Sequence, residues 1–394
     1  MLIWFGFSLA VCSLLYLSRR SLALGMAVAA VVLAAFTLSF PEMGHALLAT
    51  FGDPSVLLLA LVVGLIPMIG GSLEISGQMD RLVANMRIRV KPFLVLSPAL
   101  LGMLPMPGGA LLSAPLVERG APTTSADVKA AANVWFRHTP LLIYPLAPSL
   151  IASAKVASLD LYRVIPYLVP AFLVSLLLGY VFLLRRTEGR VGTSDRFSLR
   201  GLLVPLGIIL AAPVLDLLLK ISVSLPYPEI GTAFGVGASL LAAIGIGRLR
   251  ATALKTVIRK MRPWKFSLII LAMFAFLNVF KASGAPESLA ALSLPPIFLC
   301  VVVGFVLGLI TGRIQAPTSI IIPIFITTYG AMSPAAFAVT YSAVFLGYLI
   351  TPIHPCISVS LEYFSTSMSD FLRKMALPIV VGAIITLTVG FWVL

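Results

Sequence analysis

The stretch Leu101-Gly102-Met103-Leu104-Pro105-Met106-Pro107-Gly108-Gly109 interrupts an apolar segment that covers about residues 92–118. A second apolar segment, at about 294–330, is interrupted at its centre by Gly312-Arg313-Ile314-Gln315-Ala316-Pro317-Thr318-Ser319. Proline removes a backbone donor and glycine permits a reversal of the chain, so each centre breaks a helix. We therefore expect each segment to form a re-entrant hairpin that enters and leaves a membrane on the same side.

The composition around these stretches is typical of a chain surrounded by lipid. Of the 394 residues, 60% are hydrophobic and 11% are charged, which gives too little polar surface to cover a soluble protein. The sequence predicts an all-α polytopic membrane protein with about ten transmembrane helices and two re-entrant hairpins. The predicted spans are 2–17, 22–40, 55–72, 128–154, 161–184, 201–223, 231–247, 266–281, 334–363 and 371–394.

The basic residues predict the orientation and argue against nucleic acid as a partner. The formal net charge is +14, but the Lys and Arg residues lie in short loops between apolar segments instead of along one groove. If both hairpins are re-entrant, 22 of the 28 basic residues lie on one face, which the positive-inside rule makes cytoplasmic. We expect a multi-pass protein of the cell (inner) membrane, with the Arg185 to Arg200 loop inside and both termini outside.

The two halves of the sequence repeat each other at an offset of about 207 residues. Ser76-Gly77 matches Ser283-Gly284, and Pro145-Leu146-Ala147-Pro148 matches Pro352-Ile353-His354-Pro355. Five spans in each half give the halves opposite orientations, and inverted repeats with broken helices are typical of secondary transporters. We predict a first inverted repeat over 1–190, a cytoplasmic linker over 191–200 and a second inverted repeat over 201–394.

Each half contains two places where backbone groups are freed at membrane depth, the hairpin tip and the Pro-x-x-Pro of the next span. Helix N-termini at such breaks suit an anion, and freed carbonyls suit a cation. A single proline often only kinks a membrane helix, but a repeated pair beside two hairpins favours a substrate site. The predicted helix breaks are Pro145, Pro148, Pro352 and Pro355.

Two arginines occupy positions where an unpaired charge is costly. Arg137 lies in the fourth span and Arg313 at the second hairpin break, and ionisable groups at this depth normally face a cavity or a partner. A guanidinium binds carboxylate or phosphate through its planar fork. We predict that Arg313 binds an anionic substrate and that Arg137 contributes more weakly. The alternative is an internal ion pair with Glu362, Asp216 or Glu74.

The other predicted substrate contacts lie beside the same breaks. His354 lies between two prolines, where an imidazole either titrates in proton coupling or has a structural role. Ser and Thr side chains also often bond their own helix backbone. The remaining predicted substrate contacts are Gly108, Gly109, Asn133, Gln315, Thr318, Ser319 and Thr351.

No metal or cofactor is predicted, because the three histidines and the three cysteines show no metal-ligand spacing.

On these two hairpin motifs and the two Pro-x-x-Pro breaks, the chain resembles the ion transporter superfamily, which includes citrate, gluconate, arsenite and divalent-anion permeases. Within that group it is most similar to the membrane family called domain of unknown function four hundred and one. The resemblance covers nearly the entire chain and implies hairpins that meet near the midplane, a scaffold part that often dimerises and a mobile transport part. The Ser-Asn-Thr motifs that hold sodium and carboxylate in dicarboxylate relatives have no counterpart here, since Pro107-Gly108-Gly109 and Ala316-Pro317-Thr318 occupy the comparable tips.

The predicted function is secondary active transport of a small anionic solute by alternating access, coupled to protons or sodium. The expected partners are the solute, the coupling ion, membrane lipid and a second copy of the chain. An ion channel is the alternative within the same fold class, and flux measurements distinguish the two. A membrane enzyme needs a nucleophile or a metal set on facing spans, and the sequence shows neither, so we predict that the chain is not an enzyme.

Overall fold

The computed structural model describes residues 2–106, 109–185, 187 and 197–394, and in these residues every regular element is a helix. The predicted all-α polytopic membrane fold is confirmed. Seven helices are long and apolar enough to cross a membrane, and α1 and α2 are shorter apolar helices of 17 and 16 residues. Gly108 and most of the predicted linker at 191–200 lie outside the described residues.

The first half of the chain forms ten α-helices and two short turns of other helix types. They are α1 (Leu2–Ser18), α2 (Leu22–Thr37), α3 (Phe40–Gly52), α4 (Pro54–Ile75), α5 (Gln78–Ala84), α6 (Val90–Gly102), α7 (Gly109–Gly120), α8 (Ala126–His138), a 3₁₀ turn (Thr139–Leu142), α9 (Pro148–Val156), α10 (Leu161–Leu178) and a π-helical turn (Gly179–Leu183).

The second half repeats this order. Its elements are α11 (Leu199–Ser222), α12 (Glu229–Gly247), α13 (Ala251–Met261), α14 (Pro263–Ala282), α15 (Ala285–Ala290), a π-helical turn (Phe298–Val303), α16 (Gly304–Thr311), α17 (Gln315–Tyr329), α18 (Pro334–Ile350), α19 (Pro355–Tyr363) and α20 (Met368–Val393).

Local backbone geometry recurs between the halves. Gly77 follows α4 and Gly284 follows α14, and both have a φ of 69°. Ser158 and Ser365, which follow α9 and α19, have φ angles of 55° and 50°. Positive φ is uncommon for residues other than glycine. A positive φ at both of these serines is therefore specific to the turns that follow α9 and α19. Positive φ therefore recurs at two pairs of positions that lie 207 residues apart.

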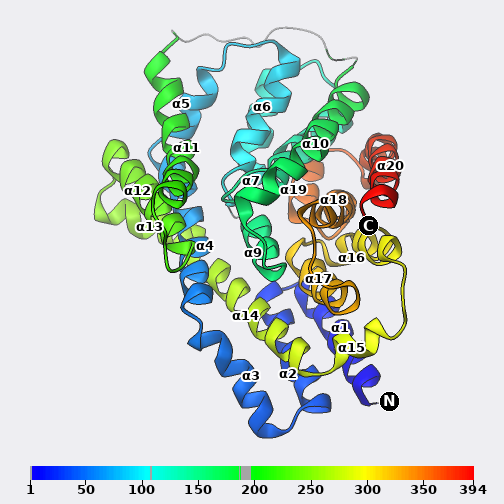
Figure 1. Cartoon of the computed structure of the whole chain (residues 1–394). Helices are drawn as coiled ribbons and strands as arrows, with labels where there is room; N and C mark the ends of the chain where they lie inside the picture. Colours follow the sequence, from blue (N-terminus) through cyan, green and yellow to red (C-terminus); the bar gives the residue numbers. More distant parts are fainter. Residues whose placement is uncertain (1, 107–108, 186, 188–196) are drawn as a thin grey trace.

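The helices form two groups in space. The first group contains α1–α5 and α11–α15, in which α1 packs on α2, α11 on α12, and α14 on both α2 and α4. The second group contains α6–α10 and α16–α20, in which α6 packs on α8, α16 on α18, and α17 on α9. In Figure 1, α4, α11, α12 and α13 lie on the left, while α10, α16, α18 and α20 lie on the right. Each group takes one block of consecutive helices from each half of the chain.

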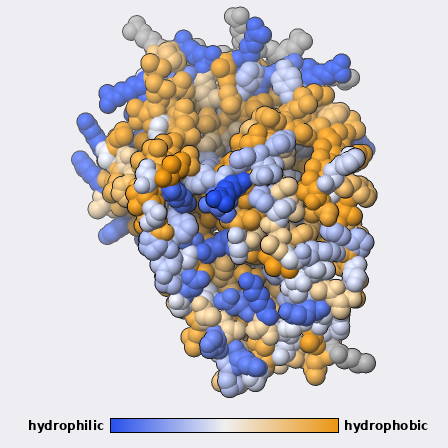
Figure 2. Space-filling model, in the orientation of Figure 1, coloured by the Kyte–Doolittle hydropathy of each residue, from blue (hydrophilic) through white to orange (hydrophobic). Residues whose placement is uncertain are grey.

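The surface shows which helices face lipid. Apolar residues cover much of the face seen in Figure 2, and polar residues lie at its upper end, near its centre and over its lower part. Of the apolar span window in α4, 78% is buried, against 22% in α20, whose Phe391 and Trp392 are exposed. Exposed apolar area of this extent is unfavourable in water and favourable in a bilayer. Helix α4 is therefore central, and α20 is peripheral.

The two long segments with Pro-x-x-Pro are discontinuous helices. The chain leaves helical geometry after Leu142 and resumes it at Pro148, and it does so again between Ile350 and Pro355. In both cases the second proline is the first residue of a nine-residue helix, α9 or α19. Proline suits this position because its missing N–H would have no partner in the helix and its φ is already helical. Each break leaves a helix N-terminus in the second group.

Candidate functional site

The first hairpin closes around Arg137. The side chain of Arg137 on α8 is buried, and its Nη1 donates to the Ser113 hydroxyl on α7 at 3.4 Å. A Cβ added at Gly102 would lie 1.8 Å from the Arg137 carbonyl oxygen, and one at Gly109 would lie 1.9 Å from Nη2. Helices α6 and α7 therefore approach α8 through glycines on each side of the hairpin tip, and a larger residue at either position would require Arg137 to shift.

The second hairpin presents Arg313. The turn between α16 and α17 is held by Thr311, whose hydroxyl donates to the Arg313 carbonyl at 3.1 Å and accepts from the Arg313 N–H at 3.3 Å. Gly312 in this turn has a φ of 60°. The charges of Arg313 and Arg137 act on the same three side chains, Tyr348, His354 and Cys356. Helix α8 and the second hairpin thus each direct a guanidinium towards the N-terminus of α19.

Neither arginine is neutralised by an acid. Within the described residues, no carboxylate lies within ion-pair distance of Arg137 or Arg313. The three acids predicted as alternative ion-pair partners do not pair with either arginine. Asp216 pairs with Lys220 at 2.9 Å, Glu74 pairs with Lys260 at 2.6 Å, and Glu362 is exposed. Positive charge without a counter-charge at membrane depth is costly, and neither arginine forms an internal ion pair with the acids of the described residues.

Buried polar atoms without a partner gather in the same region. Six such side-chain atoms occur in the described part of the chain, and three of them belong to predicted site residues: Asn133 Oδ1, Thr351 Oγ1 and His354 Nε2. Thr351 ends α18, His354 precedes α19, and Asn133 on α8 contacts α19 by donating to Ser360 Oγ at 3.0 Å. Buried polar groups are normally hydrogen-bonded. The break before α19 and the facing side of α8 thus contain three buried polar atoms that no protein group satisfies.

Other predicted contacts have structural roles. The Thr318 hydroxyl donates to the Ile314 carbonyl at 3.0 Å and lies 2.8 Å from Ser153 Oγ, which joins α17 to α9. The Ser319 hydroxyl donates to the Ala316 carbonyl at 2.8 Å. Gln315 is half-buried at the start of α17. The hydroxyls of Thr318 and Ser319 thus satisfy helix backbone.

Three aromatic or ionisable residues complete the cluster and were not among the predicted contacts. The His138 ring lies 4.6 Å from the His354 ring and 5.3 Å from the Tyr348 ring, measured between centroids. Cys356 follows His354 on α19. His138 is next to Arg137 in the sequence, and Tyr348 lies one turn before the proline break. The sequence places His138, an ionisable residue, beside Arg137 in the fourth span, but it does not single out Tyr348 or Cys356, because the contacts of α8 with α18 and α19 are set by tertiary packing.

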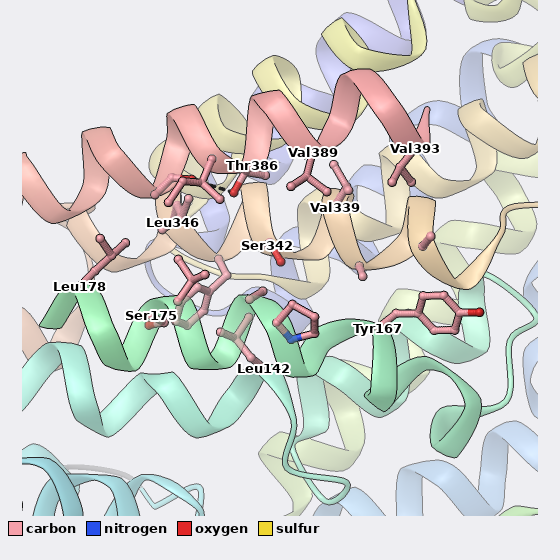
Figure 3. A pocket seen from close by; sticks show the side chains of 18 of the residues that line it. Leu142, Tyr167, Ser175, Leu178, Val339, Ser342, Leu346, Thr386, Val389 and Val393 are labelled. Atoms are coloured by element: carbon pink, nitrogen blue, oxygen red, sulfur yellow. Dashed lines mark hydrogen bonds between the residues drawn. The ribbon is translucent and has the colours of Figure 1, made fainter. Parts of the chain in front are cut away.

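An apolar cavity near this cluster is a separate feature. A cavity of about 240 Å³ lies between α10, α18 and α20, with Tyr167, Leu346 and Val389 among its walls (Figure 3). It reaches Trp135 of α8, whose indole N–H donates to the Ser175 carbonyl at 2.9 Å. None of the arginines or histidines lines it. Its walls suit a lipid chain, and it is not the polar site.

Comparisons with known proteins agree with this architecture. The sequence matches, over residues 2–393, the family described as protein of unknown function (DUF401). No curated protein matches the sequence. The crystal structure of the YdaH transporter of Alcanivorax borkumensis, described as having an unusual topology, is similar with a TM-score of 0.57 and 17% sequence identity. The match covers 90% of this chain and 87% of that chain.

At this identity the structural likeness concerns the fold, while the family match extends over nearly the whole sequence. The family resemblance expected from the hairpin and proline motifs is therefore confirmed. The chain belongs to the DUF401 family, and it has a fold similar to that of a membrane transporter.

Proposed function

We propose that this protein is a secondary active transporter of a small anionic solute, which binds between Arg137 and Arg313. The observation that carries the proposal is the convergence of two guanidinium groups, without a counter-charge among the described residues, on the helix break before α19. A guanidinium offers a planar set of donors that suits carboxylate, phosphate or sulfate oxygens.

The unpartnered atoms add donors to this anion site. Thr351 Oγ1 and His354 Nε2 are buried and without a partner, and both lie at the break from which α19 begins. The first N–H groups of α19 and the positive end of its dipole also favour a negative charge. An anion at this place would satisfy groups from α8, the second hairpin and the α18–α19 break together. Binding would thus join elements from both halves of the chain.

The two helix groups suggest how access alternates. We propose that the halves are inverted repeats and that the second group moves against the first, exposing the site to each side in turn. Several polar links cross this boundary. Among them, Lys155 of α9 pairs with Glu229 of α12 at 2.7 Å, and the Tyr162 hydroxyl of α10 donates to Asp216 of α11 at 2.8 Å. These links must break and re-form during transport. The coupling ion is a proton or sodium, and the first group offers the surface for a homodimer.

The test is anion binding by the purified protein. Sulfate, phosphate, lactate, succinate and citrate are screened by thermal shift with and without sodium, because a ligand stabilises the state that it binds. Arg313→Gln and Arg137→Gln should each weaken binding by one to two decades, as expected for loss of one charge-assisted contact of about 1.5 to 3 kcal/mol. Arg313→Lys should weaken anion binding less than Arg313→Gln does, because lysine keeps the positive charge although it lacks the planar fork of donors.

The matched control is Arg163→Gln, which changes an exposed arginine of α10 away from this site. It should bind as the wild type does. Unchanged anion binding in well-folded Arg137→Gln and Arg313→Gln proteins would refute the proposal. Uptake into proteoliposomes then separates a carrier from a channel, since only a carrier exchanges internal for external labelled anion without net current.

A further inference from the structure

The hydrogen bonds of His138 and His354 set different tautomers. His138 Nδ1 lies 2.6 Å from the Val134 carbonyl oxygen, and a carbonyl only accepts, so Nδ1 carries a proton and Nε2 has a lone pair. His354 Nδ1 accepts from the backbone N–H of Cys356 at 2.9 Å, so its neutral ring carries the proton on Nε2. The pair therefore presents one proton acceptor, His138 Nε2, and one proton donor, His354 Nε2.

We propose that His138 Nε2 is the atom that binds the coupling proton and that His354 Nε2–H donates to the transported anion. This inference rests on the proposed anion site and names its coupling ion. His354 is unsuited to the extra proton, because protonating its Nδ1 would break the bond that caps α19. His138 can take a proton on Nε2 without losing its bond to Val134. The centroid of its ring lies 4.6 Å from that of the His354 ring, so the bound proton and the bound anion would be adjacent.

The surrounding charges make proton and anion binding interdependent. Arg137 acts on both histidines, and Arg313 acts on His354. With two guanidinium charges in place, a third positive charge on His138 is unfavourable until an anion neutralises part of the field. By linkage, the proton strengthens anion binding by the same factor. The site then binds an anion and a proton together and releases them together, which is symport.

Among the described residues no acid acts on either histidine, and Glu362, the one acid of α19, is exposed eight positions after His354. Tyr348 of α18 and Cys356 of α19 are the other titratable groups at the pair. Helices α6, α7 and α20 also pack on α8, and their charged residues lie at the helix ends remote from Arg137. Those residues are Lys91, Glu118, Arg119, Asp370, Arg373 and Lys374.

A metal ion is the competing occupant of this cluster. His138, His354 and Cys356 offer ligand atoms within 4.8 Å of one another, a donor set that suits a borderline or soft cation. The tautomers leave only one ring lone pair free, because His354 Nδ1 is engaged by the Cys356 N–H. Two nearby guanidinium groups also oppose a cation. Geometry and charge therefore favour the proton and the anion.

The first experiment measures sulfate and lactate binding to the full chain in nanodiscs, in sodium-free buffer between about pH 6 and pH 9, where both anions keep a constant charge. Wild-type affinity should strengthen by up to tenfold for each unit that the pH falls, as one bound proton requires. His138→Gln should bind with the weaker affinity that the wild type shows at high pH, and without pH dependence. His45→Gln, which changes the exposed histidine of α3, should keep the wild-type slope.

The proton assignment would be overturned if the anion affinity of the wild type did not change with pH, or if anion binding required sodium. It would also be overturned if the His138→Gln protein kept the pH dependence of the wild type. If Arg137→Gln and Arg313→Gln still weaken binding in that case, the anion site stands and only the coupling ion is wrong. If neither arginine matters, the anion site itself fails. Strong thermal stabilisation by Zn²⁺ that is lost in His354→Gln would instead support the metal.

A second experiment needs no variant at the site, and its tautomer measurement needs no anion. Solid-state nitrogen NMR of histidine-labelled His45→Gln protein reports only His138 and His354. Above about pH 8 the two rings should show opposite neutral tautomers, and added sulfate near pH 6 should convert only the Nδ1–H ring to the charged form. Two rings with the same tautomer, or conversion of the other ring, would contradict the assignment.

Discussion

Gly109 and Arg137 share so little space that a Cβ on residue 109 would lie 1.9 Å from the Arg137 Nη2 atom. The nearest atom is the end of a flexible side chain, so Gly109→Ala should fold while displacing the guanidinium. We expect anion affinity to fall about tenfold, which corresponds to about 1.4 kcal/mol, with little change in Tm. Gly207→Ala, where an added Cβ meets nothing within 4 Å, is the control. A large loss of Tm with unchanged affinity in the remaining folded protein would contradict this role.

Gly102→Ala should have the opposite signature. Its Cβ would lie 1.8 Å from the Arg137 carbonyl oxygen, and backbone of a packed helix cannot rotate away. Overpacking of this kind typically costs about 1 to 3 kcal/mol, so the Tm of the purified protein should fall clearly. Anion affinity measured well below the Tm should change less than in Gly109→Ala. A Gly102→Ala protein as stable as the wild type would show that α6 and α8 are not packed this closely.

Lys155→Met should destabilise the protein because it leaves the mostly buried Glu229 carboxylate without its partner. Lys155 Nζ lies 2.7 Å from Glu229 Oε1 and also donates to the Ser55 hydroxyl, and breaking a buried pair costs about 3 kcal/mol. Thermal unfolding of Lys155→Met, Glu229→Gln and the double variant measures the coupling. The double variant should be more stable than the sum of the single losses predicts.

An exposed pair in the same chain provides the control for that cycle. Arg373 and Asp370 are 3.7 Å apart, and the Arg373 side chain is 79% exposed. Arg373→Gln should therefore change stability by no more than about 0.5 kcal/mol. If Lys155→Met had as small an effect as this control, the proposed link between the two helix groups would carry no energy.

The orientation in the membrane is tested by labelling. A cysteine at Ser198, before α11, should be protected from an impermeant thiol reagent in intact cells, and a cysteine at Val223, after α11, should react. The expectation follows from the basic residues on the Arg185 to Arg200 loop and the positive-inside rule. Cys12, Cys300 and Cys356 are first replaced by alanine or serine. The reverse labelling pattern would overturn the predicted orientation.

Much of the architecture could be predicted because lipid simplifies the physics. Apolar length predicts where α4, α10, α11 and α20 begin and end within a few residues, since a membrane span must satisfy its own backbone. The Pro and Gly clusters predict that the interrupted stretches do not form single helices. The short elements α3, α5, α13 and α15 were not predicted, because they connect spans and their formation depends on packing against neighbours.

The candidate site was predictable only in part. Arg137, Arg313, Asn133, Thr351 and His354 stand out because they are polar residues beside breaks in apolar segments, and the structure leaves each with unpaired charge or an unpartnered atom. Thr318 and Ser319 looked equivalent in the sequence, but their hydroxyls bond helix carbonyls. Whether a hydroxyl faces its own backbone or a ligand is decided by the rotamer and by packing, which a sequence pattern does not contain.

Gly77 and Gly284 allow the same substitution to be compared at two matching positions in one molecule. They share a φ of 69°, and an added Cβ would meet nothing within 4 Å at residue 77 and only Ile3 Cδ1, at 3.7 Å, at residue 284. Alanine at either position would therefore carry the same left-handed penalty of about 1 kcal/mol with almost no steric contribution. Any difference between the two variants would measure how firmly each half of the fold resists the same local distortion, with the other half as the reference.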